Sequence, residues 1–377
     1  MIPTVYPDMH KDRDAHSVLY VDPFSGDDHN HLYDDDLFLS ECIAPLTREF
    51  LVATSFASGA NLRRQLNVET CETPRLNSKT LLQRFRLLRL FLSLPCSRFQ
   101  HVVFQSFEEL SVLFFMFCYP SKRVHLIVTN NLRPDRFKRH PMIGPFFLCA
   151  VFRNAASVIV HSSYEVNKVK EIAPSIDSSK VFVKPFHQFG FNRVQLSWQE
   201  KSRTILFLGP ACVHKKVEPV IDLINGDKER RFRYVFCSMR ESMAPQTRAF
   251  LEAQNNVGLS FGYTVADEYY RLFSEAALII LTHDKDFEGT LSGAFCDAIA
   301  SGTPVIARDM APHNEFFERF GPMGFLVDYD IPEWYKHVLG ADFGIIYNVF
   351  QQNMAACRAS CTMEANREMF REILARE

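Results

Sequence analysis

Short, nearly continuous apolar runs alternate with longer amphipathic stretches along most of this chain. The runs cover residues 17–22, 49–56, 101–107, 124–130, 157–163 and 180–186 in the first half, and 204–210, 234–239, 277–283, 303–309 and 324–330 in the second. Runs of Val, Ile, Leu and Phe of this length, separated by helical segments, are typical of parallel strands buried on both faces. The pattern therefore predicts an α/β protein whose parallel sheets are covered by helices on both sides.

A polar stretch, FHQFGFNRVQLSWQEKSR (186–203), separates the two sets of strands and has no clear hydrophobic period. We interpret it as the linker between two doubly wound, Rossmann-like domains, predicted to span residues 1–195 and 196–345. The tail, 346–377, is predicted to be helical and ends in EANREMFREILARE. Its Met369, Phe370 and Leu374 can pack back onto the first domain.

Composition fits two sizeable domains, because 377 residues with 47% hydrophobic content can bury large cores. Lys+Arg 42 and Asp+Glu 44 give a formal net charge of -2, which argues against nucleic acid as a partner of the whole chain. The Cys residues form no C-x-x-C pair and the start lacks the apolar run of a signal peptide, so we expect a cytoplasmic protein. No segment approaches the ~18 apolar residues of a membrane span.

The stretch FEGTLSGAFCDAIASGTPVIA (287–307) follows a predicted strand and opens a helix on small residues. A helix that begins near Ser292 directs its free N–H groups and positive dipole end into the crevice beyond the strands, which suits a phosphate. Gly289 and Gly293 permit close approach of the backbone, and Asp297 lies about 7 Å along the helix, within reach of an attached ribose. The alternative is an ordinary capped core helix.

A second anion-binding loop is indicated by TILFLGPACVHKKVEPVIDLI (204–224). A buried strand ends in a Gly turn, and Lys215 and Lys216 fall where the next helix starts. Cations at that position oppose the helix dipole unless an anion is close. A solvated pair of loop lysines is the simpler interpretation, but two such loops in one domain favour a shared anion.

The order GP-x4-KK, then VGLSFGYTVADEYYRLFSEAALIIL, then FEGTLSGAFCDAIASGTPVIA, then a Glu and GFLVDY, resembles the donor half of GT-B glycosyltransferases of the retaining family four. The first half shares the strand rhythm and the phrase SVIVHSSYEVNKV. This resemblance implies two Rossmann-like domains that face a cleft. It also implies transfer of a sugar from a nucleotide-diphosphate sugar, with retention of configuration.

The resemblance also implies site residues. Gly209 matches the phosphate-binding turn, Lys215 the lysine and Asp297 the ribose-binding acid, but Pro210 stands where the family has Arg. Glu288 is one residue out of register with the first family acid, and an inserted loop residue would restore it to the sugar hydroxyls. The predicted catalytic residues are Lys215 and Glu288. The predicted donor-binding residues are Gly209, Lys216, Arg240, Thr290, Leu291, Ser292, Gly293 and Asp297.

Polar residues after strands of the first domain are candidates for the acceptor side, although His161 is equally a candidate structural histidine. These weaker candidates are Ser25, Gly26, His29, Asn130 and His161. The D-x-D pair Asp284 and Asp286 can hold Mg²⁺ beside donor phosphates, but the phosphate-binding loop makes a metal redundant. We therefore predict no metal and no cofactor. A nicotinamide enzyme is disfavoured because no G-x-G-x-x-G follows the first strand.

Two basic-aromatic segments lie in the first half, TLLQRFRLLRLFLSL (80–94) and RPDRFKRHPMIGPFF (133–147). One interpretation of the first is a buried helix whose Arg84, Arg86 and Arg89 extend to solvent. The other is contact with an anionic membrane surface, which the second segment also fits.

The function predicted from these features is glycan biosynthesis by a cytoplasmic glycosyltransferase. If the basic-aromatic segments contact an anionic membrane, the enzyme is also peripheral on that membrane. Its partners would be a nucleotide-sugar donor and a glycan or lipid-linked acceptor. Lys215 and the N–H groups near Ser292 would stabilise the departing diphosphate. A sugar-nucleotide epimerase or hydrolase on the same fold, and a catalytically silent subunit that binds a partner, remain alternatives.

Overall fold

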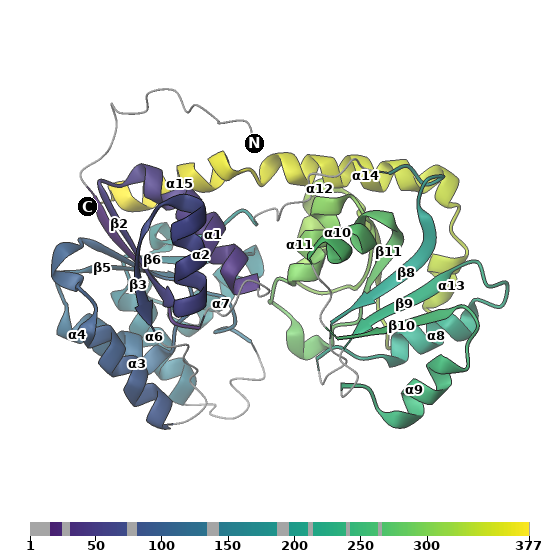
Figure 1. Cartoon of the computed structure of the whole chain (residues 1–377), viewed down its shortest axis with the longest axis horizontal. Helices are drawn as coiled ribbons and strands as arrows, with labels where there is room; N and C mark the ends of the chain where they lie inside the picture. Colours follow the sequence, from purple (N-terminus) through teal and green to yellow (C-terminus); the bar gives the residue numbers. More distant parts are fainter. Residues whose placement is uncertain are drawn as a thin grey trace.

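The computed structural model describes residues 16–24, 31–73, 81–133, 143–186, 196–209, 214–238, 242–262 and 266–376. They form two α/β units that lie side by side, each built on one wholly parallel sheet (Figure 1). The α/β class and the doubly wound parallel sheets predicted from the apolar runs are confirmed.

The first sheet has seven strands in the order β3-β2-β1-β4-β5-β6-β7. Their bounds are β1 Ser17–Asp22, β2 Glu49–Ser55, β3 Glu69–Thr73, β4 His101–Phe104, β5 Arg123–Ile127, β6 Ser157–Val160 and β7 Val181–Val183. Successive side chains of β1 alternate between two cores, because a strand directs neighbouring residues to opposite faces. Val18 and Tyr20 belong to one core, and Leu19 and Val21 to the other.

Helices cover both faces of this sheet, as the apolar strands require. One layer consists of α1 His31–Ile43, α2 Phe56–Leu66 and, from the end of the chain, α15 Met363–Ala375. The other consists of α3 Leu81–Ser93, α4 Glu109–Cys118, α6 Ile143–Asn154 and α7 Ser163–Ile172.

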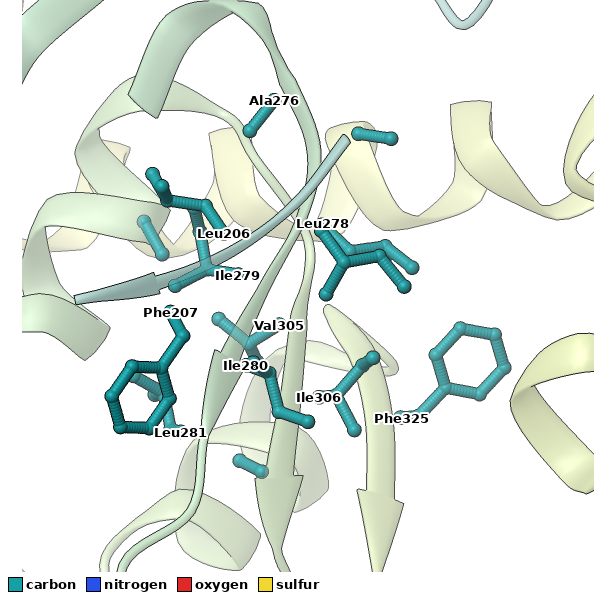
Figure 2. Close-up of a cluster of buried hydrophobic side chains, with 14 of the residues drawn as sticks. Leu206, Phe207, Ala276, Leu278, Ile279, Ile280, Leu281, Val305, Ile306 and Phe325 are labelled. Carbon is teal, nitrogen blue, oxygen red and sulfur yellow. The ribbon is translucent and has the colours of Figure 1, made fainter. Parts of the chain in front are cut away.

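The second sheet has six strands in the order β10-β9-β8-β11-β12-β13. Their bounds are β8 Ser202–Leu208, β9 Arg233–Ser238, β10 Val257–Phe261, β11 Ala276–Leu281, β12 Val305–Arg308 and β13 Gly324–Val327. The helices of this unit are α8 Glu218–Gly226, α9 Pro245–Glu252, α10 Ala266–Glu275, α11 Gly293–Ser301, α12 His313–Phe320, α13 Tyr335–Leu339 and α14 Phe343–Ser360. Aliphatic side chains of β8, β11 and β12, with Phe325 of β13, fill the core at the centre of the sheet (Figure 2).

The last two helices connect the units. Tyr347 and Met354 of α14 are buried in the core of the second unit, whereas Phe370 and Leu374 of α15 are buried against the first sheet. Figure 1 shows α14 and α15 running along one side of the molecule, from the second unit to the first. The last described helix therefore returns to the unit that contains β1.

Two strands lie outside the apolar runs, β3 and β10, and each forms the edge of its sheet. An edge strand has a neighbour on one side alone and is less buried, so ETCET and VGLSF need not be continuously apolar. Within the described ranges, no helix combines the length and the apolar content needed to cross a membrane.

Candidate active site

The central feature of the second unit is the place where its strand order reverses, between β8 and β11. These strands are neighbours, with Leu206 opposite Ile279, while their connections lead to opposite edges of the sheet. In open α/β sheets, ligands bind in the crevice beyond the strand ends at such a switch point. The loops after β8 and β11 therefore define the candidate site.

Backbone contacts fix these two loops to each other. The N–H of Lys216 donates to the carbonyl of Thr282 at 3.2 Å, and the N–H of Asp284 donates to that of His214 at 3.0 Å. Lys215 and His283 form an antiparallel bridge between these bonds. The Lys215 backbone consequently has a fixed place beside the end of β11.

The side chains of the two neighbouring lysines have different environments. Lys215 Nζ donates to the Leu208 carbonyl at 2.6 Å, so its ammonium lies at the end of β8. Lys216 Nζ lies 2.9 Å from Asp284 Oδ2, in a salt bridge whose lysine side chain is 48% exposed. The hydrogen bond from Lys216 lowers the pKa of the Asp284 carboxyl. Lys215 is thus held at the switch point, while Lys216 is paired near the surface.

Gly209 has a structural reason to be glycine. Its φ of +84° is a left-handed conformation that favours glycine. A Cβ at this position would lie 3.3 Å from Lys215 Nζ, so a side chain would also crowd the ammonium. The turn predicted as phosphate-binding is therefore adjacent to the predicted catalytic lysine.

Helix α11 begins at Gly293 with Ser292 as its N-cap, which confirms the helix start predicted from the sequence. Ser292 makes no side-chain cap bond, and the first N–H groups of a helix have no intrahelical acceptor. Thr290 and Ser292 are buried, and the Thr290 N–H donates to the Phe287 carbonyl in a tight turn. Leu291 and Gly293 are half-buried, so the helix start offers backbone donors beside largely enclosed hydroxyl groups.

Asp297 lies one turn into α11 and is 1% exposed. Its Oδ2 accepts a hydrogen bond of 2.6 Å from the Tyr269 hydroxyl of α10. This bond anchors the carboxylate beside the helix start. Binding of a ribose by Asp297 stays a prediction.

Glu288 and Gly289 lie where the two units meet. The Tyr164 hydroxyl of α7 is 3.5 Å from Glu288 Oε2. A Cβ on Gly289, whose φ is +81°, would lie 2.6 Å from Cε1 of the same tyrosine. Position 289 therefore has little room for a side chain, and the acid of this loop stands at position 288. A catalytic role for Glu288 stays a prediction.

Residues that follow strands of the first sheet also contact the second unit. Glu315 of α12 accepts bonds from the N–H groups of Ser163 and Tyr164 at 2.8 and 2.6 Å, and so caps α7 from the other unit. Arg133, which follows β5, lies 5.5 Å from the centre of the Phe287 ring. The sequence placed Arg133 in a membrane-facing segment, but the structure places it against the second unit.

His283 is the main site residue that the sequence reasoning missed. Its ring is buried, stacks on Phe287 at 4.2 Å, and has no hydrogen-bond partner for Nδ1 among the described residues. Burial, with a smaller effect of nearby Lys215, lowers its pKa well below the usual value, so the imidazole is neutral. The signal in the sequence was its position two residues after β11. The stretch THDKDF instead suggested its two acids as metal ligands.

Arg308 holds the backbone of His283 in place. Its Nε donates to the His283 carbonyl at 3.1 Å, and its Nη1 lies 3.0 and 3.1 Å from Asp328 and Asp330. The buried guanidinium thus links the His283 loop to the segment that follows β13.

The acceptor-side candidates are only partly described. Asn130 is exposed beyond β5, and His161 follows β6, where its N–H donates to Glu165 Oε2 at 2.6 Å. Burial raises the pKa of the Glu165 carboxyl to about 8. Ser25, Gly26, His29, Arg240 and Pro210 lie outside the described residues.

The D-x-D pair, Asp284 and Asp286, lies in the loop after β11. Asp284 is bound to Lys216, and Asp284 Oδ1 also accepts the Lys285 N–H at 2.8 Å. In the parts of the chain that the structure describes, no group of three or more His, Cys, Asp or Glu is placed to hold a metal ion. Metal-independent chemistry stays a prediction.

Comparisons with known proteins identify the fold. No family model and no curated protein matches this chain. Solved structures match over nearly its whole length. A structure of HepE from Anabaena in complex with UDP and glucose has a TM-score of 0.73 at 12% identity, covering 96% of this chain and 100% of that one.

Two further structures have the same architecture. A glycosyltransferase from Rickettsia africae has a TM-score of 0.68 at 14% identity, covering 97% of this chain and 100% of that one. UDP-GlcNAc 2-epimerase from Neisseria meningitidis, bound to UDP-GlcNAc, has a TM-score of 0.61 at 14% identity, covering 95% and 99%. The chain therefore has the two-domain GT-B fold, with Rossmann-like domains and C-terminal helices. At these identities no assignment to the retaining family four follows.

Proposed function

We propose that this protein is a glycosyltransferase that moves a sugar from a nucleotide-diphosphate sugar to a glycan or lipid-linked acceptor. The observation that carries the proposal is the joined pair of loops at the β8/β11 switch point. There Lys215 pairs with the buried His283, and the loop that contains His283 leads to the start of α11. The UDP in the similar HepE structure supports a UDP-sugar as the first donor to test.

The catalytic contribution of this arrangement is electrostatic. Breaking the bond between the sugar and the diphosphate leaves negative charge on the diphosphate. The Lys215 ammonium and the N–H groups at the start of α11 stabilise that charge from fixed positions, so little reorganisation is needed during the reaction. Neutral His283 adds a hydrogen-bonding group, and Glu288 binds sugar hydroxyls. Retention of configuration is part of the proposal, with no protein nucleophile assigned.

The proposal is tested first by donor binding. A thermal-shift screen with UDP-, GDP- and ADP-sugars should identify one base, since a ligand at 100 times its Kd stabilises by about 2.7 kcal/mol. Release of the nucleoside diphosphate should then depend on an added acceptor. Failure of every nucleotide sugar to stabilise the protein would contradict the proposal and favour a catalytically silent subunit.

A sugar-nucleotide epimerase is the second candidate, because a UDP-GlcNAc 2-epimerase is among the similar structures. Epimerisation needs no acceptor, whereas transfer does. Incubation of the donor alone, followed by NMR of the sugar protons, separates the two. An altered sugar that is still attached to the nucleotide would favour the epimerase, and free sugar would favour a hydrolase.

Metal independence is a separate prediction. Lys215 and the helix start already supply positive charge to the leaving group, so turnover should persist after EDTA treatment. Activity that is lost in EDTA and restored by Mg²⁺ or Mn²⁺ would instead assign Asp284 and Asp286 to a metal site.

The proposal also places the enzyme in the cytoplasm, in peripheral contact with a membrane when its acceptor is lipid-linked.

A further inference from the structure

Three neighbouring helices of the first domain expose an unusual number of large apolar side chains. Helix α4 packs between α3 and α6, and the three lie at the lower left of Figure 1. Phe117 is 82% exposed, Phe146 69%, Leu82 62% and Phe85 61%. We define the α3–α4–α6 face by its exposed apolar and cationic residues, which are Leu82, Phe85, Leu92, Leu110, Phe114, Phe117, Phe146, Arg84, Arg86 and Arg89.

This exposure is not a consequence of a poorly filled core. Each of the three helices already buries its opposite side under the first sheet, through Leu87 and Phe91, Val112 and Phe115, and Leu148 and Phe152. The helices are thus apolar on both sides, whereas a helix on the surface of a soluble domain is usually apolar on one side. A large exposed apolar patch marks an interaction site.

Charge on the face indicates what it contacts. The three helices contain Arg84, Arg86, Arg89 and Arg153 but a single acid, Glu109. Arg84 lies 3.5 Å from Glu108, while Arg86 and Arg89 form no ion pair with any described residue. Aromatic side chains interleaved with cations complement an anionic lipid surface, in which rings enter the interface and guanidinium groups meet phosphates.

A second copy of this chain is a poorer occupant of the face. Symmetric contact through one patch places the same residues against each other, so the arginines of one face would meet those of its copy. Like charges brought together in this way oppose association.

We propose that the α3–α4–α6 face docks on an anionic bilayer surface. This inference deepens the proposed function by naming the surface from which a lipid-linked acceptor would be reached, but docking itself requires no turnover. The structure revises the surface drawn from sequence at Arg133, which contacts Phe287 of the second unit, and keeps Phe146 of the same segment.

Co-sedimentation of the full chain with vesicles tests the proposal. Phosphatidylcholine vesicles that contain phosphatidylglycerol should bind the protein at low salt, and pure phosphatidylcholine vesicles should bind it much less. Raising the salt from 0.01 M to 1 M should weaken the binding, because the Debye length falls from about 30 Å to about 3 Å.

Paired variants locate the contact. Arg86→Gln with Arg89→Gln should lower the partition coefficient about 30-fold, since each cation near such a surface contributes about 1 kcal/mol. Phe117→Ser with Phe146→Ser should lower it at least about tenfold, because two rings no longer enter the interface. Ile345→Ser is the matched control, because this residue is 71% exposed on α14 of the other domain and should leave binding unchanged.

Equal binding to both vesicle types, or binding to neither, would overturn the proposal. So would a dimer in light scattering that Phe117→Ser abolishes, since the face would then join two copies of the chain. Thermal stabilisation by UDP, measured on the same samples, distinguishes failure of the docking proposal from failure of the proposed function. A response to UDP without vesicle binding would refute the docking surface and leave the proposed function intact.

Discussion

Single residues at the switch point differ in ways that their types do not reveal. Lys215 and Lys216 are adjacent and chemically identical, yet one is fixed at the end of β8 and the other is paired with Asp284. An exposed ion pair contributes little, because solvent screens it. A preorganised charge beside a leaving group contributes much more. The two lysines therefore form a natural matched pair for mutagenesis.

Lys215→Ala should reduce kcat about 10²–10³-fold, because removing one preorganised donor to developing charge costs about 2.7–4 kcal/mol. Lys216→Ala should reduce kcat less than tenfold, and both variants should retain the far-ultraviolet circular dichroism of the parent. Steady-state kinetics with the donor identified by thermal shift provides the measurement. The reverse order of effects would move the catalytic assignment to Lys216.

Asp297→Ala should weaken binding of the free nucleoside diphosphate by about 1–3 kcal/mol, the range for losing hydrogen bonds to a charged group. Tyr269→Phe is the control, since it removes the 2.6 Å bond to Asp297 and keeps the acid. Calorimetric titration compares the variants. An unchanged affinity for Asp297→Ala in a folded protein would remove this residue from the site.

Among the elements, the first sheet contains a buried row of polar groups across three strands. His101 Nδ1 lies 2.9 Å from His125 Nε2, and His125 Nδ1 lies 2.9 Å from Ser157 Oγ, so the row links β4, β5 and β6. Burial lowers the pKa of His101 to about 4, with smaller effects of His16 and Arg123, and lowers the pKa of His125 to about 3, with smaller effects of His101 and Arg123. Both imidazoles are consequently neutral near pH 7.

This row predicts a loss of stability in mild acid. Both folded pKa values lie below the ordinary value of about 6.5, so between pH 6.5 and pH 3 the unfolded chain binds more protons than the folded one. Stability is therefore greatest above pH 6.5 and falls as the pH is lowered. For His125 alone the loss between pH 7 and pH 5 is about 2 kcal/mol.

Urea unfolding at pH 7 and pH 5 measures this effect. In His125→Gln, the difference in unfolding free energy between the two pH values should shrink by about 2 kcal/mol relative to the parent protein. His337→Gln, at an exposed position in the second domain, should keep the parental difference. Equal acid sensitivity of the two variants would assign the loss to other groups.

At the scale of the whole molecule, two of the connections between the units differ in kind. Helix α15 packs on α1 and buries Phe370 and Leu374 against the first sheet. Glu315 of α12 caps α7 across the domain contact with bonds of 2.8 and 2.6 Å. A carboxylate at a helix start also interacts favourably with the helix dipole. The first connection is apolar and extensive, whereas the second is a pair of hydrogen bonds to one side chain, beside the Tyr164–Glu288 and Arg133–Phe287 contacts.

Glu315→Ala should therefore loosen the domain contact without unfolding either domain. Hydrogen exchange at the Ser163 and Tyr164 amides should accelerate at least about tenfold, because hydrogen bonds to a charged acceptor contribute about 1.5–3 kcal/mol. Small-angle scattering should show a larger radius of gyration. Glu318→Ala, exposed on the same helix, is the control. Unchanged exchange at both amides would contradict a role for Glu315 in domain closure.

The sequence by itself determined the α/β alternation, because a parallel strand buried on both faces must be apolar along its own length. The exact agreement at β1 has this local origin, and the start of α11 was indicated by the small residues before Gly293. The edge strands β3 and β10 were not predicted, because a partly buried strand need not be continuously apolar. The order of loops in the second half also determined which segments flank the switch point, because strand ends converge there in any doubly wound sheet.

Only the tertiary structure decided how residues from distant segments meet. Glu315 caps Ser163 across 152 positions of sequence, and Tyr164 leaves little room for a side chain at Gly289. Arg133 turned toward the second domain rather than the outer surface, and His283 was enclosed by loops from β8 and β11. Such contacts impose no period on the chain, because each depends on the relative position of two packed units and not on the burial of one element.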